Sequence, residues 1–272
     1  MTENNQKKGR VILTYGRSLM ALTAAHSLGE RGIEIIGCDD VDMTVLSFSN
    51  YTTNYFTHAP YQSHLDQYLD DMEENIKKYK PDDDRPYILM PMFRDAKIIA
   101  KFKERFEPFI TVATPDYDTI RQITPKSVFA DTCERLSLTI PLTLQPQDES
   151  ELEPLLEKIE YPVLVKTIDG VGGRGITKAH NEQELRTQYK ESVTSYGTPP
   201  LIQEVINGKD YCLTAICDRG EIVSSMAYTN IYQFPRGTGA GIMRETISEQ
   251  PFIEASEKLP DHPRRLETKN IT

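Results

Sequence analysis

A short glycine-rich stretch limits the possible folds of this sequence more than any other segment. Residues 170–175 read GVGGRG, which has the G-x-G-x-x-G spacing of several nucleotide-binding loops. The stretch follows the apolar run YPVLVK at 161–166 and leads into GITKA at 175–179, which alternates like a strand. The sequence therefore predicts a glycine-rich hairpin that joins two antiparallel strands.

The residues after the glycines separate the known classes of glycine loop. In a Rossmann fingerprint a helix begins at the last glycine, whereas here the next predicted helix begins only after Asn181. A P-loop has a lysine after its last glycine, where this chain has Ile176 and then Thr177. A protein kinase also places such a loop in a hairpin, but neither H-R-D nor D-F-G follows in this sequence. The remaining interpretations are a flap whose backbone N–H groups close over phosphates and a glycine-rich hairpin without a ligand.

Two other segments fit a phosphate-binding flap. Lys166 ends the strand before the glycines, where its ammonium can point at a phosphate oxygen or simply keep a strand edge soluble. Residues 203–206 (QEVI) close a later strand and lead through Asn-Gly-Lys to Asp210. Such a bend can offer backbone groups to an adenine edge and a carboxylate to ribose hydroxyls, and it can equally be an ordinary strand–turn–strand.

The first part of the chain predicts an α/β domain. Strands and helices alternate from residue 10 to about residue 115, which favours a parallel sheet with helices on its faces. The predicted strands are RVILT (10–14), IEIIGCDD (33–40), YILMPMF (87–93) and FITVATP (109–115), and the predicted helices span about 18–30, 64–79 and 95–106.

The pattern changes near residue 120. A helix is predicted to begin with Thr124 as its N-cap and Pro125 in its first position, and to end near Leu136. Asn181 and Glu184 form an Asn variant of a capping box before another helix. The other predicted elements of this part are helices at 149–159 and 182–192 and strands at 201–206 and 210–218.

Composition excludes some classes of protein. The 272 residues carry a net charge of −10, which disfavours a general nucleic-acid binder. The N-terminal residues are polar, and no apolar run is long enough to span a bilayer, so no membrane association is expected. The sequence has no C-x-x-C pair, which indicates reduced thiols of a cytoplasmic protein rather than disulfides or zinc ligands. The cysteines are Cys38, Cys133, Cys212 and Cys217.

Taken together, these segments resemble the ATP-grasp superfamily, in particular its carboxylate–amine ligase-like branch, which includes carbamoyl-phosphate-synthase-type domains. The resemblance covers roughly residues 10–250. It is carried by VILTYGRSLMALTAAHSLGERGIEIIGCDD, ITPKSVFADTCERLSLTIPLT, PVLVKTIDGVGGRGI, LIQEVINGKDYCLTAICDRGEIV and GTGAGIMRETI. It implies a Rossmann-like pre-ATP-grasp domain at 1–122 and an incomplete α+β ATP-grasp domain at 123–272. Within the latter, it implies a lid subdomain with the glycine hairpin at 123–200 and the start of a C-terminal subdomain at 201–272.

The resemblance also implies a set of phosphate contacts. Lys126 and Lys166 would contact the α- and β-phosphates of ATP, and Arg244 would stabilise the transferred phosphoryl group or an acyl-phosphate intermediate. The loop would cap the β- and γ-phosphates through Gly170, Gly172, Gly173, Arg174 and Gly175.

On the nucleoside side, the resemblance implies contacts from the segment after the later strand. Gln203 and Glu204 would offer carbonyl oxygens to the adenine amino group. Past Val205, the Ile206 N–H would meet adenine N1, and Asp210 would bind the ribose. The implied activity is an ATP-dependent ligase that phosphorylates a carboxylate so that an amine can attack the acyl phosphate.

The sequence departs from the superfamily pattern at the expected Mg²⁺ site. The superfamily supplies a Glu on one strand and a Glu-x-Asn on the next, but no Glu-x-Asn follows Glu204, and LETKN at 266–270 has the wrong spacing. The metal ligands are therefore unknown. We expect a form truncated before the magnesium-binding strands, a degenerate member, or a chain that a partner or a second copy completes. An exposed apolar edge and self-association would follow.

Three functional hypotheses stay open at this point. The first is the ligase, and the second is a non-catalytic nucleotide-binding or regulatory protein on the same fold. The third is an NAD(P)-dependent oxidoreductase, in which Asp39 or Asp40 would bind ribose, although the first turn at 14–18 lacks the three glycines. Arg94 and Asp95 can line a substrate pocket, and Asp95 can equally be a helix N-cap.

Overall fold

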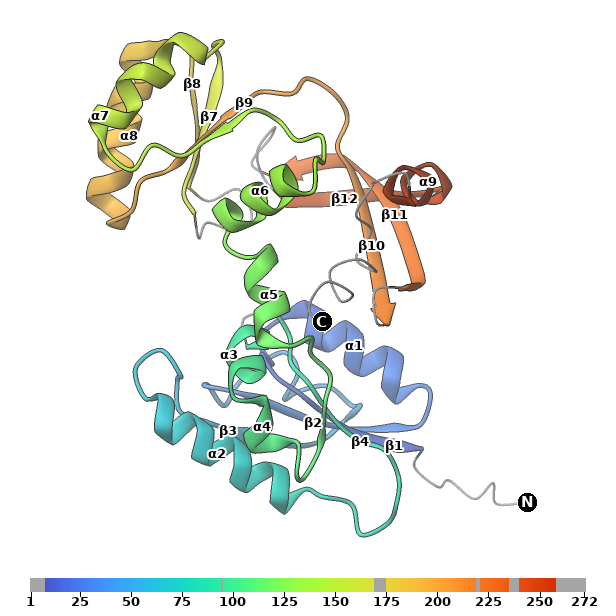
Figure 1. The fold of residues 1–272 in the computed structure, drawn as a ribbon. Coiled ribbons are helices and arrows are strands. Elements are labelled where there is room, and N and C mark those ends of the chain that lie inside the picture. The colour runs from blue at the N-terminus through green and yellow to red at the C-terminus, as the bar shows by residue number, and fades with distance from the viewer. Residues whose placement is uncertain (1–7, 94, 169–174, 219–220, 235–239, 258–272) are drawn as a thin grey trace, which may run out of the picture. The chain divides into compact units, whose positions relative to one another are not determined.

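The chain forms two compact units that each combine helices and strands. The computed structural model describes residues 8–93, 95–168, 175–218, 221–234 and 240–257. The units are Met1–Ile120 and Arg121–Thr272, and their division falls inside the helix α5 (Tyr117–Ile123). The first contains a parallel sheet and the second contains antiparallel sheets (Figure 1), which confirms the predicted fold class.

The first unit contains a five-stranded sheet with the order β3-β2-β1-β4-β5. All neighbouring strands run parallel, as the alternation of strands and helices predicts. The strands are β1 (Gly9–Leu13), β2 (Ile33–Asp39), β3 (Thr52–Thr57), β4 (Tyr87–Met90) and β5 (Thr111–Val112), and the helices are α1 (Leu19–Gly29), α2 (Leu65–Lys78), α3 (Ala96–Lys101) and α4 (Lys103–Phe106).

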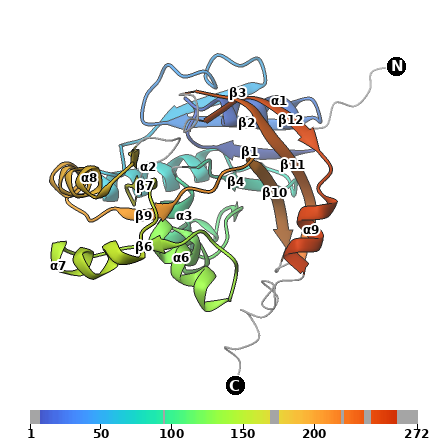
Figure 2. The same ribbon diagram turned by 90° about the horizontal axis from the view of Figure 1, so that it is seen from above.

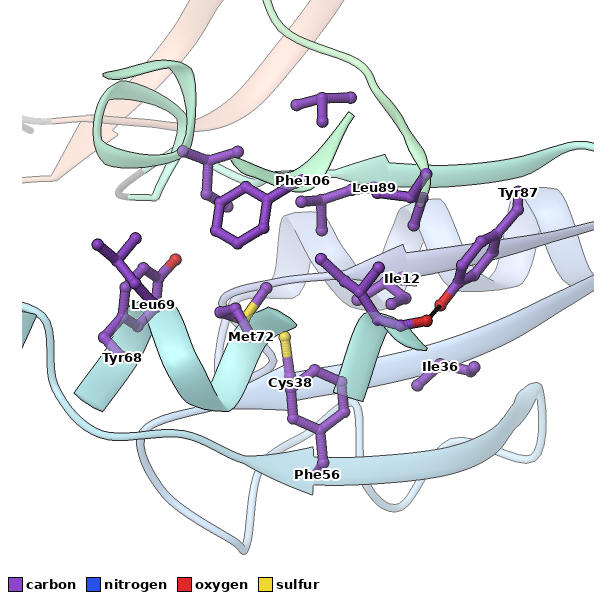
Figure 3. Close-up of a cluster of buried hydrophobic side chains, with 14 residues drawn as sticks. Ile12, Ile36, Cys38, Phe56, Tyr68, Leu69, Met72, Tyr87, Leu89 and Phe106 are labelled. Atoms are coloured by element: carbon purple, nitrogen blue, oxygen red, sulfur yellow. Dashed lines mark hydrogen bonds between the residues drawn. The ribbon is translucent and has the colours of Figure 1, made fainter. Parts of the chain in front are cut away.

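Successive residues of the strands face opposite sides of this sheet and form two separate cores. On one side, Ile12 and Leu89 pack with α2 and α4 in the cluster that Figure 3 shows. The hydroxyl of Tyr87 donates to the carbonyl oxygen of Ile76 at 2.8 Å in this cluster, which satisfies a buried polar group. On the other side, Leu13 packs with α1.

Two elements of this unit differ from the predictions. The edge strand β3 is not among the predicted strands, because its sequence TTNYFT is mostly polar and buries only Phe56. The helix predicted at 95–106 is broken into α3 and α4, because Phe102 between them leaves the helical conformation at φ −114°.

The second unit begins with a four-stranded antiparallel sheet of the order β6-β9-β7-β8. Its core joins Val163 and Val165 on the sheet to Leu185 and Tyr189 on a helix. The strands are β6 (Thr143–Leu144), β7 (Val163–Lys166), β8 (Ile176–Ala179) and β9 (Leu201–Glu204). The helices are α6 (Lys126–Arg135), α7 (Glu149–Leu152), the 3₁₀ helix η1 (Glu153–Lys158) and α8 (Glu182–Tyr196).

The helix starts in this unit test the capping predictions. The Glu184 N–H donates to Asn181 Oδ1 at 2.9 Å, which confirms the predicted cap of α8. The Glu184 carboxylate accepts from the His180 N–H at 2.8 Å rather than from the Asn181 N–H. The predicted start of α6 is wrong by one residue: Pro125 has an extended ψ of 177° and is the N-cap, so the helix begins at Lys126.

A three-stranded antiparallel sheet follows, with the order β10-β11-β12. It consists of β10 (Tyr211–Asp218), β11 (Glu221–Phe234) and β12 (Ala240–Ile247), and α9 (Gln250–Glu257) lies beside it in Figure 2. The rings of Tyr211 and Phe252 join this helix to the sheet at a centroid distance of 5.7 Å. Among the described side chains of these strands, only Ala227 is buried, and many large apolar side chains are exposed. They are Tyr211, Ile216, Val223, Met226, Ile231, Tyr232, Phe234, Ile242 and Met243.

Candidate nucleotide-binding site

The predicted glycine hairpin is confirmed. β7 and β8 pair antiparallel with Lys166 opposite Ile176, and the Thr167 N–H donates to the Gly175 carbonyl oxygen at 2.8 Å. Gly175 has φ +72°, and a Cβ atom there would lie 2.2 Å from Thr167 Oγ1. The base of the hairpin therefore requires glycine at position 175. Gly170, Gly172, Gly173 and Arg174 lie outside the described residues.

Two lysines from different elements meet at this base. Lys126 is the first residue of α6, and its Nζ donates to the carbonyl oxygens of Thr167 at 3.3 Å and Ile168 at 3.1 Å. Lys166 ends β7 and is half-buried. Burial and, second, the positive charge of Lys126 lower the pKa of the Lys166 ammonium. Among the ion pairs of the described residues, none includes Lys166, so this positive charge is available to an anion.

The Gln203 side chain lies on the same face as Lys166. Gln203 pairs with Leu164 in the β7–β9 ladder, and Lys166 lies two residues farther along β7. The Lys166 ammonium donates to Gln203 Oε1, and Gln203 Nε2 donates to Thr143 Oγ1 at 2.8 Å. The sequence predicted a role for the Gln203 carbonyl only. The contact with Lys166 becomes visible only when the register of the strands is known.

The next residues point elsewhere. Glu204 follows Gln203 and therefore faces the opposite side of the sheet, where it lines a cavity of about 220 Å³ with Val163 and Ile202. Its N–H donates to the Leu142 carbonyl oxygen at 3.0 Å. Val205 is half-buried, and Ile206 is exposed beyond the end of β9.

Asp210 and Arg244 belong to the three-stranded sheet. The carboxylate of Asp210 accepts a hydrogen bond from Gln233 Nε2, and its carbonyl oxygen accepts from Thr229 Oγ1 at 2.8 Å. Arg244 stands opposite Asn230 in the ladder, and its guanidinium carbon lies 4.7 Å from the centre of the Tyr228 ring. This stacking orients an exposed arginine, so the guanidinium can still receive an anion.

The described residues fit one of the two implied ligands, the nucleotide, better than the other, the Mg²⁺ ion. Lys126 and Lys166 at the base of the hairpin fit the phosphates of ATP, since both ammonium groups can donate to phosphate oxygens. Within the described ranges, no three His, Cys, Asp or Glu side chains gather to hold a metal ion. The described residues therefore do not form a Mg²⁺ site.

The first unit offers little support for a dinucleotide site. The buried carboxylate of Asp39 accepts from the Arg17 N–H at 2.9 Å and from Arg17 Nε at 3.0 Å. The Arg17 guanidinium also pairs with Asp40. The hydrogen bond with Asp39 raises the pKa of Arg17, as expected of a strong ion pair. Arg17 thus already occupies the Asp39 carboxylate oxygens that would bind a ribose in a dinucleotide site.

Arg94 and Asp95, the two residues predicted to line a substrate pocket, precede α3. Asp95 is the N-cap residue of α3 and is buried, but its side chain makes no capping hydrogen bond. Arg94 lies outside the described residues.

Among the helices of the described residues, none combines the length and the apolar character that a membrane span needs.

Comparison with known proteins agrees with this geometry. Residues 124–236 match the family model of an ATP-grasp domain. The carbamoyl phosphate synthase large chain of Methanoregula boonei is 34% identical over 90 residues, which are 32% of this chain and 8% of that protein. This chain therefore matches only a small part of the length of that relative.

Two solved structures share the fold. The L-amino acid ligase from Bacillus licheniformis has a TM-score of 0.67 and 12% identity over 98% of this chain and 61% of that one. The biotin carboxylase domain of Hydrogenobacter thermophilus 2-oxoglutarate carboxylase, a dimer in complex with MgADP, ADP and bicarbonate, has a TM-score of 0.59. It is 21% identical and covers 82% of this chain and 50% of that one. Residues 124–236 of this chain are thus similar to an ATP-grasp domain, and the solved structures share its fold.

Proposed function

We propose that this protein binds ATP and acts as an ATP-dependent ligase that activates a carboxylate as an acyl phosphate for attack by an amine. The observation that carries the proposal is the pair Lys126 and Lys166 at the base of the glycine hairpin. Two ammonium groups held close together in a half-buried site repel each other, and a polyphosphate relieves that repulsion.

The chain's own residues would act mainly by binding and orienting ATP. Each lysine would form charge-assisted hydrogen bonds with phosphate oxygens, worth about 1.5–3 kcal/mol each. The glycine hairpin 170–175 would cover the β- and γ-phosphates with backbone N–H groups. ATP supplies the phosphoryl group that converts a carboxylate into an acyl phosphate, and Arg244 would stabilise the negative charge of that group.

The nucleoside would bind along the end of β9. We propose that the carbonyl oxygens of Gln203 and Glu204 accept from the adenine amino group and that the Ile206 N–H donates to adenine N1. Asp210 would accept from ribose hydroxyls after releasing its present donor, Gln233. In this arrangement residues 1–122 would serve as the pre-ATP-grasp domain and residues 123–272 as the ATP-grasp domain.

The second candidate is a nucleotide-binding protein without turnover. The observation that favours it is the lack of a metal-binding group of acids among the described residues. ATP-dependent ligation needs the charge of the phosphates to be neutralised, and among the described residues Lys126, Lys166 and Arg244 would do so. Binding of ATP without release of ADP would favour the second candidate.

The partners proposed are ATP and a small carboxylate, and we propose a cytoplasmic location because the cysteines of the described residues are free thiols. Self-association is proposed on the exposed apolar side chains of the three-stranded sheet. Light scattering over a range of protein concentrations measures the oligomeric state directly.

Calorimetric titration with ATP, with and without Mg²⁺, tests the proposed function. Lys166→Ala should weaken binding about tenfold or more. Lys190→Ala is the matched control, since Lys190 is an exposed lysine of α8 that pairs with Glu149. Equal affinities of the two variants, or no binding to the wild type at millimolar ATP, would overturn the proposal. Release of ADP in the presence of carboxylates and amines then separates the ligase from the second candidate.

A further inference from the structure

Three polar side chains form a continuous hydrogen-bonded row on one face of the four-stranded sheet. Gln203 stands opposite Thr143 on one side and opposite Leu164 on the other. Lys166 lies two residues beyond Leu164 and so shares its face. Gln203 Nε2 donates to Thr143 Oγ1 at 2.8 Å, Thr143 Oγ1 donates to the Pro141 carbonyl oxygen at 2.9 Å, and the Lys166 ammonium donates to Gln203 Oε1.

The direction of each hydrogen bond in this row is fixed by its ends. The Pro141 carbonyl oxygen can only accept, so it takes the single hydrogen of the Thr143 hydroxyl. Thr143 Oγ1 can then only accept from Gln203, which must present its NH₂ group there. The amide oxygen of Gln203 is left to face Lys166, whose ammonium can only donate. Reversing the amide would place two donors face to face at Lys166 and two acceptors face to face at Thr143.

We propose that Thr143 is a positioning residue: it fixes the amide of Gln203, which in turn holds the Lys166 ammonium in place for a polyphosphate anion. This inference rests on the proposed function for its ligand. The holding group matters because lysine has a long, flexible side chain, and fixing it before binding lowers the entropic cost of binding. The amide is neutral, so it orients Lys166 without cancelling the charge that the anion needs.

The row contrasts with a similar Thr–Gln hydrogen bond in the same unit. Thr177 Oγ1 donates to Gln188 Oε1 at 2.7 Å on the surface, between β8 and α8. Thr177 pairs with Val165 and therefore faces the side of the sheet opposite to Lys166. Thr177→Val thus removes a hydroxyl and a Thr–Gln hydrogen bond without touching the row.

The test is a double-mutant cycle with ATP affinity as its readout. Thr143→Val should raise the Kd for ATP about 3- to 10-fold, because one hydrogen bond is lost. The conservative Thr143→Ser keeps the hydroxyl and should restore most of that affinity, and Thr177→Val should bind like the wild type. In a Gln203→Leu background, Thr143→Val should have no further effect, since it acts through Gln203. Equal losses in both backgrounds, or equal losses for the Val and Ser variants, overturn the proposal.

A second measurement separates this inference from the proposed function. Reductive methylation of lysines, followed by mass spectrometry without nucleotide, reports how firmly the Lys166 ammonium is held. Thr143→Val should increase the methylation rate of Lys166 and leave that of Lys190 unchanged. If the wild type binds no ATP but the Lys166 rate still rises, the row positions Lys166 and the proposed ligand is wrong. If the Lys166 rate does not change, Thr143 does not position Lys166.

Discussion

Gly175→Ala is the substitution whose effect the structure defines most sharply. Gly175 has φ +72°, and its carbonyl oxygen accepts from the Thr167 N–H at 2.8 Å, which closes the hairpin between β7 and β8. An alanine Cβ would lie 2.2 Å from Thr167 Oγ1 and 2.8 Å from Thr167 Cγ2. Gly197 is the matched control, because it has φ +69° at the end of α8 and nothing within 4 Å of its added Cβ.

The two glycines separate backbone strain from steric conflict. Alanine at Gly197 meets only the left-handed backbone penalty, about 1–2 kcal/mol. Alanine at Gly175 meets the same penalty and also displaces the buried Thr167, which adds about 1–3 kcal/mol by analogy with overpacked cores. Gly175→Ala should therefore destabilise the protein by about 2–5 kcal/mol, clearly more than Gly197→Ala. Thr167→Ala in the same chain removes the two nearest atoms and should relieve part of the difference.

Hydrogen–deuterium exchange is the suitable assay, because two units need not unfold as one. Peptides that cover 163–168 and 175–179 report the opening of the β7–β8 pair. Calorimetry with ATP on the same variants reports how much this opening weakens ATP binding. Faster exchange in these peptides for Gly175→Ala, with partial recovery in the double variant with Thr167→Ala, is the expected result. Equal destabilisation by Gly175→Ala and Gly197→Ala, with no coupling to Thr167, would show that the contact with Thr167 is not what requires glycine.

Four other predictions concern the charged groups of the chain and its choice of nucleotide. The pKa of Lys166 is lowered by burial and by the charge of Lys126, and a bound polyphosphate favours its charged form. ATP binding at a pH near this lowered pKa should therefore take up protons, so its heat should depend on the ionisation enthalpy of the buffer. Without ATP, the folded state binds fewer protons than the unfolded state at pH values between the lowered pKa of Lys166 and the ordinary lysine pKa. Lys166 therefore makes the free energy of unfolding rise with pH in that window. Urea titrations at several pH values measure this rise. Arg17→Met should destabilise the first unit by about 1–3 kcal/mol in the same urea assay, since it leaves the buried Asp39 carboxylate without its cation. Because Arg17 already pairs with Asp39, NAD titrated calorimetrically into the wild type to millimolar concentration should give no saturable heat.

The sequence was sufficient for the elements whose signals are local. Asn181 caps α8 as its short-range pattern predicts, and the helix predicted from about residue 18 begins after Ser18, whose hydroxyl accepts from the Met20 N–H at 3.1 Å. The strand β3 was not predictable in this way, because TTNYFT forms a strand only by pairing with β2 at the sheet edge. The split between α3 and α4 likewise depends on packing, since no proline or glycine marks it.

Within the candidate site, the lysines and glycines could be identified from the sequence. Lys166 and the glycine-rich stretch stand out in the sequence itself, whereas Lys126 is assigned to the same ligand only by the resemblance to a known family. Thr143 and Thr167 are not visible, because each acts through a partner that is distant in sequence and is brought near by strand register. Threonines in strands are common, so residue type alone carries no signal of their roles.

The placement of Lys126 at a helix N-terminus suits a site that receives an anion. It is the first residue of α6, where the helix dipole places partial positive charge and disfavours a cation, and the first turn of this helix contains no acidic residue. The second cation, Lys166, loses part of its hydration by burial and is repelled by Lys126. Negative charge close to the two ammonium groups would make each of these three features more favourable. None of the described ion pairs places a carboxylate beside Lys166, so under the proposed function a bound polyphosphate would supply the negative charge next to this ammonium.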